Sequence, residues 1–161
     1  MYFSGISDEA GKTIDRQIAA HRELGWSYLE LRTVNGVNLT RLPDDEFDQV
    51  YRAVSEAGMR VSCFASAIAN WARPITCDPE IDRQDLARAI PRMHRFGTRF
   101  IRVMSYPNDP EKPVPEDEWR REAIARRSGS SGARCGVYTL IMYDRRQPLP
   151  GVTHDLSQRR A

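Results

Sequence analysis

The strongest constraint on the fold is a module that recurs three times before residue 106. In each copy a helical stretch ends at a glycine, and a short apolar run follows within one to three residues. The junction glycines are Gly25, Gly58 and Gly97. Glycine suits the position after a helix because it adopts left-handed backbone dihedrals without a Cβ penalty. The repeat therefore predicts alternating helices and strands, which is typical of a parallel sheet with right-handed crossovers.

Strands are expected where β-branched and aromatic residues follow each junction. They are predicted at Tyr28–Leu31, Arg60–Ala65 and Phe100–Met104, after a first strand at Tyr2–Ile6 that precedes the first helix. Val137–Met142 is a further strand candidate. The first 125 residues thus contain about four βα units.

Helical periodicity connects these strands. The third helix is expected over Pro79–Phe96, where Pro91 should kink or split it because proline removes a backbone donor. A fourth helix is expected to start near Pro115. The apolar positions that define the first three helices recur at spacings near three and four. They are Ile14, Ile18 and Leu24 in the first, Phe47, Val50, Tyr51, Val54 and Ala57 in the second, and Leu86, Ile90 and Met93 in the third.

Length leaves two architectures open. Eight βα units of roughly 30–35 residues would need about 250 residues, the usual size of a (β/α)8 barrel, whereas this chain has 161. A noncatalytic, flavodoxin-like binding module with a doubly wound sheet fits that length better. A truncated barrel is the other hypothesis, because the composition changes abruptly near residue 126.

Charge is distributed unevenly along the chain. Residues 126–161 carry seven arginines against Asp144 and Asp155, while the first 125 residues carry 17 basic and 20 acidic groups. The body of the chain therefore offers no electrostatic case for nucleic-acid binding. The glycine- and serine-rich stretch RRSGSSGARCG opens the arginine-rich segment, and we expect 126–161 to be an aberrant or disordered tail.

Several other classes of protein are disfavoured. The three cysteines are far apart and form no C-x-x-C motif, which argues against a disulfide framework or a zinc cluster and favours a reducing cytoplasm. No apolar run approaches the ~20 residues of a membrane helix, so no membrane partner is expected. A P-loop, a G-x-G-x-x-G motif and a serine nucleophile elbow are also absent from the sequence.

Side-chain alternation predicts a polar pocket at the carboxyl ends of the strands, where parallel α/β folds place their sites. In a barrel, the apolar faces would meet the helices, with Leu29 and Leu31 on one strand, Val61, Cys63 and Ala65 on the next, and Ile101 and Val103 on the third. The opposite faces would bring Glu30, Arg32, Ser62, Ser66 and Arg102 to one interior, with Asn70 and Ser105 just beyond the strand ends. An ion pair between Glu30 and Arg32 or Arg102 that only holds the strands in register is the alternative interpretation.

Five segments carry a more specific resemblance. They are FSGISDEAG, LGWSYLELRTVNGVNLT, AGMRVSCFASAIANWARPI, AIPRMHRFGTRFIRVMSY and the acidic PEDEW. Together they resemble the N-terminal half of sugar phosphate isomerase/epimerase proteins of the xylose isomerase-like TIM-barrel superfamily, over roughly residues 1–125. The resemblance implies an α/β fold built as a partial (β/α)8 TIM barrel with parallel strands, followed by an irregular tail.

The resemblance also implies an activity. It indicates metal-dependent proton transfer next to the carbonyl of a sugar or sugar phosphate, with manganese, magnesium, cobalt or zinc as the divalent metal. An inosose dehydratase-like enzyme of the same superfamily is the alternative. Our substrate-binding candidates are Glu30, Arg32, Ser66, Asn70, Arg102 and Ser105, and no catalytic residue is assigned.

One departure from the family bears on activity. Its metal ligands come largely from strands five to eight, and none can be transferred to this chain. We therefore expect an incomplete site and impaired activity. Missing strands would also leave an open sheet edge, which favours association with another copy of the chain.

Overall fold

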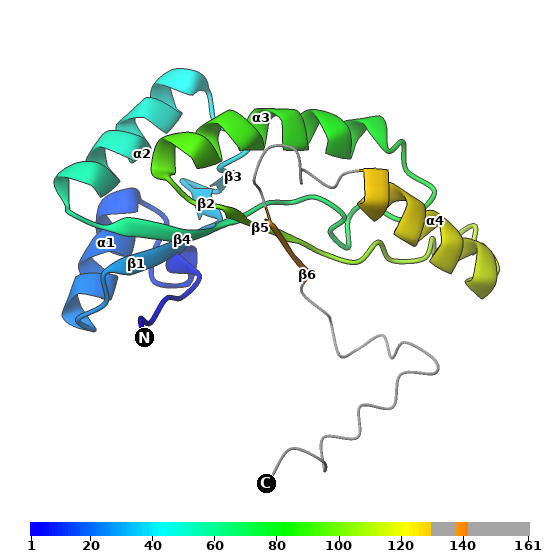
Figure 1. Cartoon of the computed structure of the whole chain (residues 1–161), viewed down its shortest axis with the longest axis horizontal. Coiled ribbons are helices and arrows are strands. Elements are labelled where there is room, and N and C mark those ends of the chain that lie inside the picture. The colour runs from blue at the N-terminus through cyan, green and yellow to red at the C-terminus, as the bar shows by residue number, and fades with distance from the viewer. Residues whose placement is uncertain (130–137, 142–161) are drawn as a thin grey trace, which may run out of the picture.

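The computed structural model describes residues 1–129 and 138–141, and the remaining residues are drawn in grey in Figure 1. The main sheet of the described part has the order β1-β4-β5-β6, and its neighbouring strands are all parallel. Its strands are β1 (Tyr28–Leu31), β4 (Arg60–Ala65), β5 (Phe100–Val103) and β6 (Tyr138–Ile141). A small antiparallel ladder pairs β2 (Thr33–Val34) with β3 (Val37–Asn38). The predicted parallel α/β architecture is confirmed.

Helices connect the strands in the predicted alternation. They are the 3-10 turn η1 (Ser7–Glu9), α1 (Ile14–Glu23), α2 (Asp44–Glu56), α3 (Glu80–Phe96) and α4 (Glu116–Gly129). The junction glycines Gly25, Gly58 and Gly97 have φ of 68°, 67° and 68°. All three therefore lie in the left-handed region, which explains why each module ends at a residue without a Cβ.

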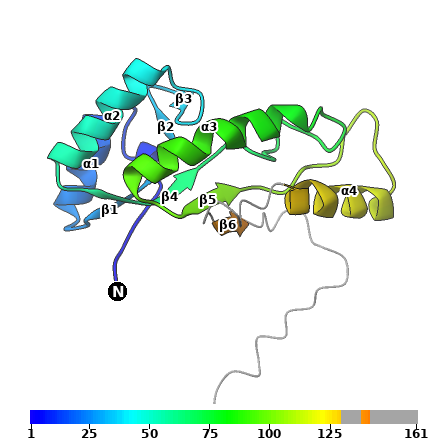
Figure 2. The ribbon, with the colours of Figure 1, turned by 45° about the horizontal axis from the view of Figure 1, so that its top comes forward.

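The apolar core lies between the sheet and its helices. Ile18 of α1, Val50 of α2 and Met93 of α3 join one buried cluster with strand residues such as Leu29 and Ile101. Figure 2 shows α1, α2 and α3 gathered on the same side of the sheet. Strands in chain order with helices on one face are typical of a barrel segment, whereas a flavodoxin-like sheet is covered on both faces. The structure is therefore a partial TIM-barrel-like fold.

Three local predictions need correction. The predicted strand at Tyr2–Ile6 is reduced to a single parallel bridge between Ile6 and Glu30, because Tyr2 and Phe3 are exposed and stack on nearby rings. Leu24 is 62% exposed instead of buried, since it is the C-cap of α1 and leaves the helical period.

The third correction concerns Pro91, which does not split α3. Pro91 and Ala87 both lie on the exposed face of the helix. The Ala87 carbonyl, which loses its usual backbone donor at Pro91, is therefore on the side where water can hydrate it. Most of the predicted tail lies outside the described residues, although the strand candidate at Val137–Met142 is observed as β6.

A bulge overturns part of the predicted strand alternation. Leu29 pairs with Val61, but Glu30 pairs with Cys63, so Ser62 is an extra residue in β4. An inserted residue reverses which face the following side chains occupy. Cys63 and Ala65 therefore share the face of Glu30 and Arg102, contrary to prediction. Phe64 instead joins the apolar core, paired with Leu31 on one side and Ile101 on the other.

Candidate functional site

A cavity of about 420 Å³ lies at the carboxyl ends of β1, β4 and β5. Four predicted pocket residues line it: Arg32, Ser66, Asn70 and Arg102. They come from three different strand ends, as expected for side chains that converge at one edge of a parallel sheet. Ser105 is half-buried outside this lining, and its role stays a prediction.

Arg32 is fixed by two acidic residues of η1. Its Nε donates to both carboxylate oxygens of Asp8 at 3.0 and 2.9 Å, and its Nη2 donates to Glu9 Oε1 at 2.5 Å. Thr33 also donates its hydroxyl proton to Asp8. The hydrogen bond with Asp8 is the main cause that raises the pKa of Arg32. Arg32 is thus a permanent cation at the cavity wall, oriented by a fork of carboxylates.

Glu30 pairs with Arg102, which lines the cavity. Their closest carboxylate oxygen and guanidinium nitrogen are 3.5 Å apart, and the side chains are 23% and 7% exposed. The predicted sharing of one sheet face is confirmed by this contact. Burial raises the pKa of Glu30, although the charges of Arg102 and Arg32 oppose that effect. A carboxyl that retains its proton at higher pH than usual is a recurrent feature of functional sites.

Cys63 lies on the same face as this pair but is chemically quiet. Burial, with a smaller contribution from the charge of Glu30, raises the pKa of its thiol to about 12. The thiol is therefore protonated at neutral pH and is a poor nucleophile.

The segment after β4 supplies two further cavity residues. Ser66 Oγ donates to the Arg102 carbonyl at 2.6 Å and accepts from the Ile68 N–H at 3.3 Å. Asn70 Oδ1 accepts from the Ala72 N–H at 3.0 Å, which closes a tight turn. The Ser66 hydroxyl thus holds the backbone of two segments together at the cavity. Asn70 both stabilises the turn and lines the cavity.

Sequence reasoning missed Trp71. Trp71 is 75% exposed and lines the cavity together with Asn70. An exposed aromatic face next to amide and guanidinium groups suits the apolar face of a hydroxylated ring. The only signal in the sequence was an aromatic residue directly after an asparagine beyond a strand end.

The described residues do not fit a metal centre. Across residues 1–129 and 138–141, no group of three or more His, Cys, Asp or Glu side chains is placed to hold a cation. The carboxylates nearest the cavity are engaged by arginines, Asp8 and Glu9 by Arg32 and Glu30 by Arg102. We therefore derive no chemical step through a metal.

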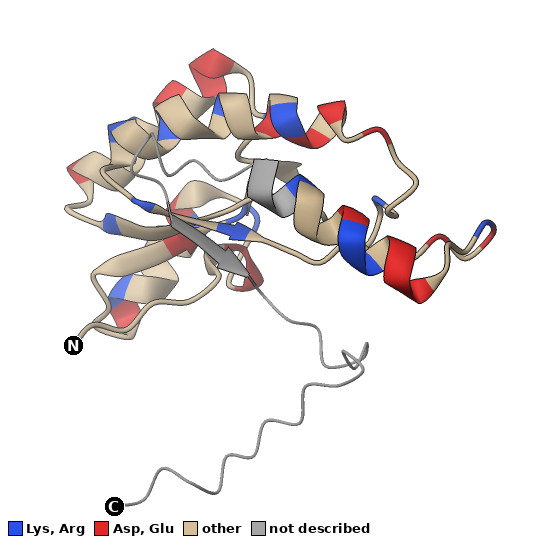
Figure 3. Cartoon of the chain, turned by 45° about the vertical axis from the view of Figure 1, so that its right-hand side comes forward, with Lys and Arg blue, Asp and Glu red and all other residues tan. Residues whose placement is uncertain are grey.

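Two further observations concern the charges along α4 and the apolar character of the helices. In Figure 3 acidic and basic residues alternate along α4. Within the described part of the chain, no helix combines the length and apolar character needed to cross a bilayer.

Comparison with known proteins identifies the fold. No protein-family model matches the sequence, and no curated protein matches it. A D-psicose 3-epimerase solved in the presence of D-fructose has a TM-score of 0.62 at 12% identity, with 88% of this chain and 52% of that chain covered. The probable 3-DHS dehydratase AsbF from Bacillus anthracis gives 0.65 at 14% identity, with the same coverage.

A third structure names the fold explicitly. A xylose isomerase-like TIM barrel protein from Mycobacterium smegmatis, solved in complex with magnesium, has a TM-score of 0.59 at 19% identity, with 86% of this chain and 52% of that chain covered. The chain therefore spans about half the length of these structures. Its fold is that of about half a xylose isomerase-like TIM barrel.

Proposed function

We propose that this chain forms the substrate-binding part of an isomerase or epimerase that acts on a sugar or sugar phosphate. Such an enzyme removes a proton from the carbon next to a carbonyl group and returns it. The observation that carries the proposal is the convergence of Arg32, Asn70 and Arg102 on one cavity at the carboxyl ends of parallel strands. Polyols carry many hydrogen-bond donors and acceptors, and the guanidinium and amide groups that line the cavity can bond to them. The shared fold with an epimerase solved in the presence of D-fructose supports this choice.

Each cavity residue has a distinct proposed role. Trp71 provides a flat apolar surface for the ring or carbon chain, and Asn70 hydrogen-bonds hydroxyl groups. Arg102 supplies positive charge near a carbonyl oxygen, where negative charge develops when the neighbouring proton leaves. Glu30 does not line the cavity, so we assign it to the orientation of Arg102. The group that removes the proton is not assigned within the described residues.

The remaining parts of the proposal concern cofactor and partners. Magnesium in one structure of the same fold and zinc in another suggest a divalent metal for the complete barrel. The partner we propose is a small sugar, in the cytoplasm, without nucleic acid or membrane. The exposed side chains of Tyr2 and Phe3 favour association with a second copy. An inosose dehydratase-like activity is the second candidate, because a dehydratase shares the fold.

The test is ligand binding first and proton exchange second. Saturation-transfer NMR with a ketohexose, a sugar phosphate and a cyclic polyol ketone should detect binding of at least one of them. Trp71→Ala should weaken that binding between about twofold and tenfold, the range of an aromatic contact. Phe3→Ala, which removes an exposed ring outside the cavity, is the matched control. Binding by none of the three ligands, or equal weakening by both variants, would contradict the proposal.

Chemistry is followed in deuterated water with each divalent metal added in turn. An isomerase or epimerase places deuterium on the carbon next to the carbonyl, and a dehydratase instead yields a product that has lost water. Binding remains the deciding measurement, because neither a metal-binding group nor a proton-removing group is assigned within the described residues.

A further inference from the structure

We propose that Asp82 and Asp85 of α3 are positioning residues for the cavity. They act through residues 66–73, the segment after β4, which we call the β4 loop. This proposal rests on the proposed function, because the β4 loop carries Asn70 and Trp71 to the cavity wall. Neither aspartate lines that cavity. Their effect is exerted through the backbone and through Arg73.

Asp82 holds the β4 loop at two points. One carboxylate oxygen accepts from the Ala69 N–H at 3.2 Å, and the other pairs with Arg73. Asn70 and Trp71 lie between these two attachment points in the chain. The orientation of both cavity side chains is therefore set by a carboxylate whose side chain is only 5% exposed.

The backbone at Ala69 shows why such a restraint is needed. Ala69 has φ of 56°, in the left-handed region that residues with a Cβ seldom occupy. This conformation is sterically unfavourable for a residue with a Cβ and persists only where surrounding contacts enforce it. The hydrogen bond to Asp82, together with burial of Ala69, provides that enforcement.

Asp85 extends the restraint to the segment after β3. It accepts from Arg73 Nη2 at 2.6 Å and from Arg41 Nε and Nη2, both at 3.2 Å. The Arg41 backbone N–H in turn donates to the carbonyl of Asn38, another cavity residue, at 2.8 Å. One turn of α3 thus connects the segments that follow β3 and β4.

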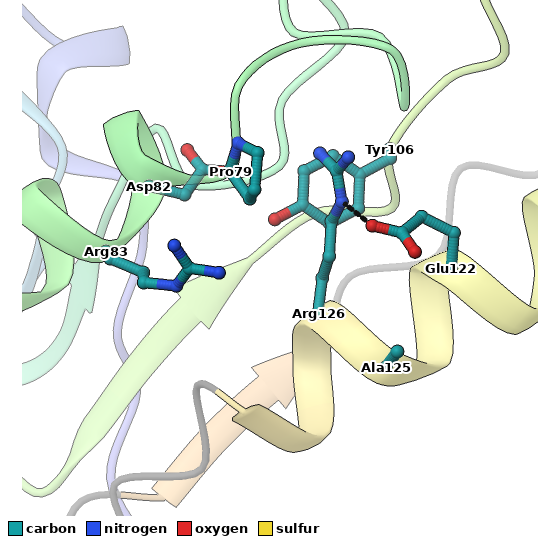
Figure 4. Close-up of a pocket in the computed structure, with 7 residues that line it drawn as sticks. All are labelled: Pro79, Asp82, Arg83, Tyr106, Glu122, Ala125 and Arg126. Atoms are coloured by element: carbon teal, nitrogen blue, oxygen red, sulfur yellow. Dashed lines mark hydrogen bonds and ion pairs between the residues drawn. The ribbon is translucent and has the colours of Figure 1, made fainter.

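Tyr106, in the segment after β5, also meets Asp82. Burial, followed by a hydrogen bond with Asp82, raises the pKa of its hydroxyl. Figure 4 shows the hydroxyl end of Tyr106 directed toward the side of α3 that carries Asp82, with Arg126 over the ring. The segments after β4 and β5 therefore meet at Asp82, while Asp85 links the segment after β3.

Asp82→Asn in the full chain tests the proposal. Two readouts report the β4 loop without any ligand: amide hydrogen exchange at Ala69, and the fluorescence of Trp71 in a background where Trp26 and Trp119 are phenylalanine. We expect exchange at Ala69 to rise at least tenfold more than exchange at Ile101 in the core, together with a shift in Trp71 emission.

Glu80→Gln is the matched control. Glu80 belongs to the same first turn of α3, but its side chain is 50% exposed and pairs with Arg83. It should leave both readouts unchanged. An equal rise at Ala69 and Ile101 would show a general loss of stability and would overturn the proposal, as would no change at Ala69.

A milder variant covers the case in which Asp82→Asn fails to fold. Arg73→Lys retains the charge but loses the fork that spans Asp82 and Asp85, so it should raise Ala69 exchange selectively and to a smaller extent. No selective rise would overturn the proposal.

Ligand binding distinguishes the positioning role of Asp82 and Asp85 from the proposed function of the cavity. If no sugar binds the parent chain while Ala69 exchange responds as expected, the proposed function fails and the control of the β4 loop stands. If a sugar binds equally well to the parent chain and to Asp82→Asn, the positioning role is overturned although the function holds.

Discussion

Glu30 and Arg102 should be energetically coupled. The losses of unfolding free energy in the two single variants should add up to more than the loss in the double variant. The two charged groups are 3.5 Å apart, and the Arg102 side chain is only 7% exposed. Unit charges at this separation attract by about 5 kcal/mol at an effective dielectric constant near 20. Desolvation opposes this attraction, as the raised pKa of Glu30 shows. The net coupling should therefore fall to about 1–3 kcal/mol.

The two single variants should differ in their dependence on pH. Glu30→Gln removes this carboxylate from a buried guanidinium, and we expect a cost of about 3 kcal/mol at neutral pH. Arg102→Met leaves Glu30, which can take up a proton.

The sign for Glu30 follows from its raised pKa. A raised pKa adds stability below the unfolded value of 4.5, and this contribution is lost as the pH rises through the folded value. The charge of Arg102 lowers the pKa of Glu30, so Arg102→Met should raise this pKa further. Glu30 in the folded variant then takes up its proton at higher pH. The loss of unfolding free energy caused by Arg102→Met should therefore shrink as the pH falls from 8 toward 5.

Urea denaturation of the parent chain, both single variants and Glu30→Gln/Arg102→Met supplies the cycle. Circular dichroism and tryptophan fluorescence should give coincident transitions, which justifies a two-state treatment. Additivity within about 0.3 kcal/mol would refute the reasoning, because it would mean that the two side chains do not meet on one face of the sheet.

Three further predictions concern the strand register, the end of α3 and self-association. Phe64→Ala should cost about 3–5 kcal/mol of unfolding free energy and Cys63→Ala much less, since the bulge puts only Phe64 in the apolar core; equal costs would contradict the register. Gly97→Ala should cost roughly 1–2 kcal/mol, measured by urea denaturation, because its φ is 68°; a neutral effect would argue against the left-handed C-cap. Phe3→Glu should shift the sedimentation profile toward the monomer, and an unchanged profile would place self-association elsewhere.

Local chemistry made the modules predictable. The helix–glycine–strand junctions follow from residues adjacent in the sequence, so Tyr28–Leu31 and Arg60–Ala65 were predicted with the bounds that the structure shows. The contact of Glu30 with Arg102 was one of two predicted alternatives, and strand alternation was enough to suggest it.

Features that depend on distant pairing were not predictable. The extra residue at Ser62 arises from the register between two strands about thirty residues apart, and no local pattern marks it. Arg32 pairs with Asp8, which lies 24 residues earlier in an irregular turn. Asp82 looks like an ordinary acid in the first turn of a helix, and only the fold reveals that it holds Ala69 and Arg73.

The most direct measurement of the central claim is a map of amide chemical shifts during titration with the sugar that binds best. We expect the largest shifts on Arg32, Asn70, Trp71 and Arg102, around the carboxyl ends of the strands. Largest shifts instead around Thr76 and Arg121, which line a separate cavity against α4, would contradict it.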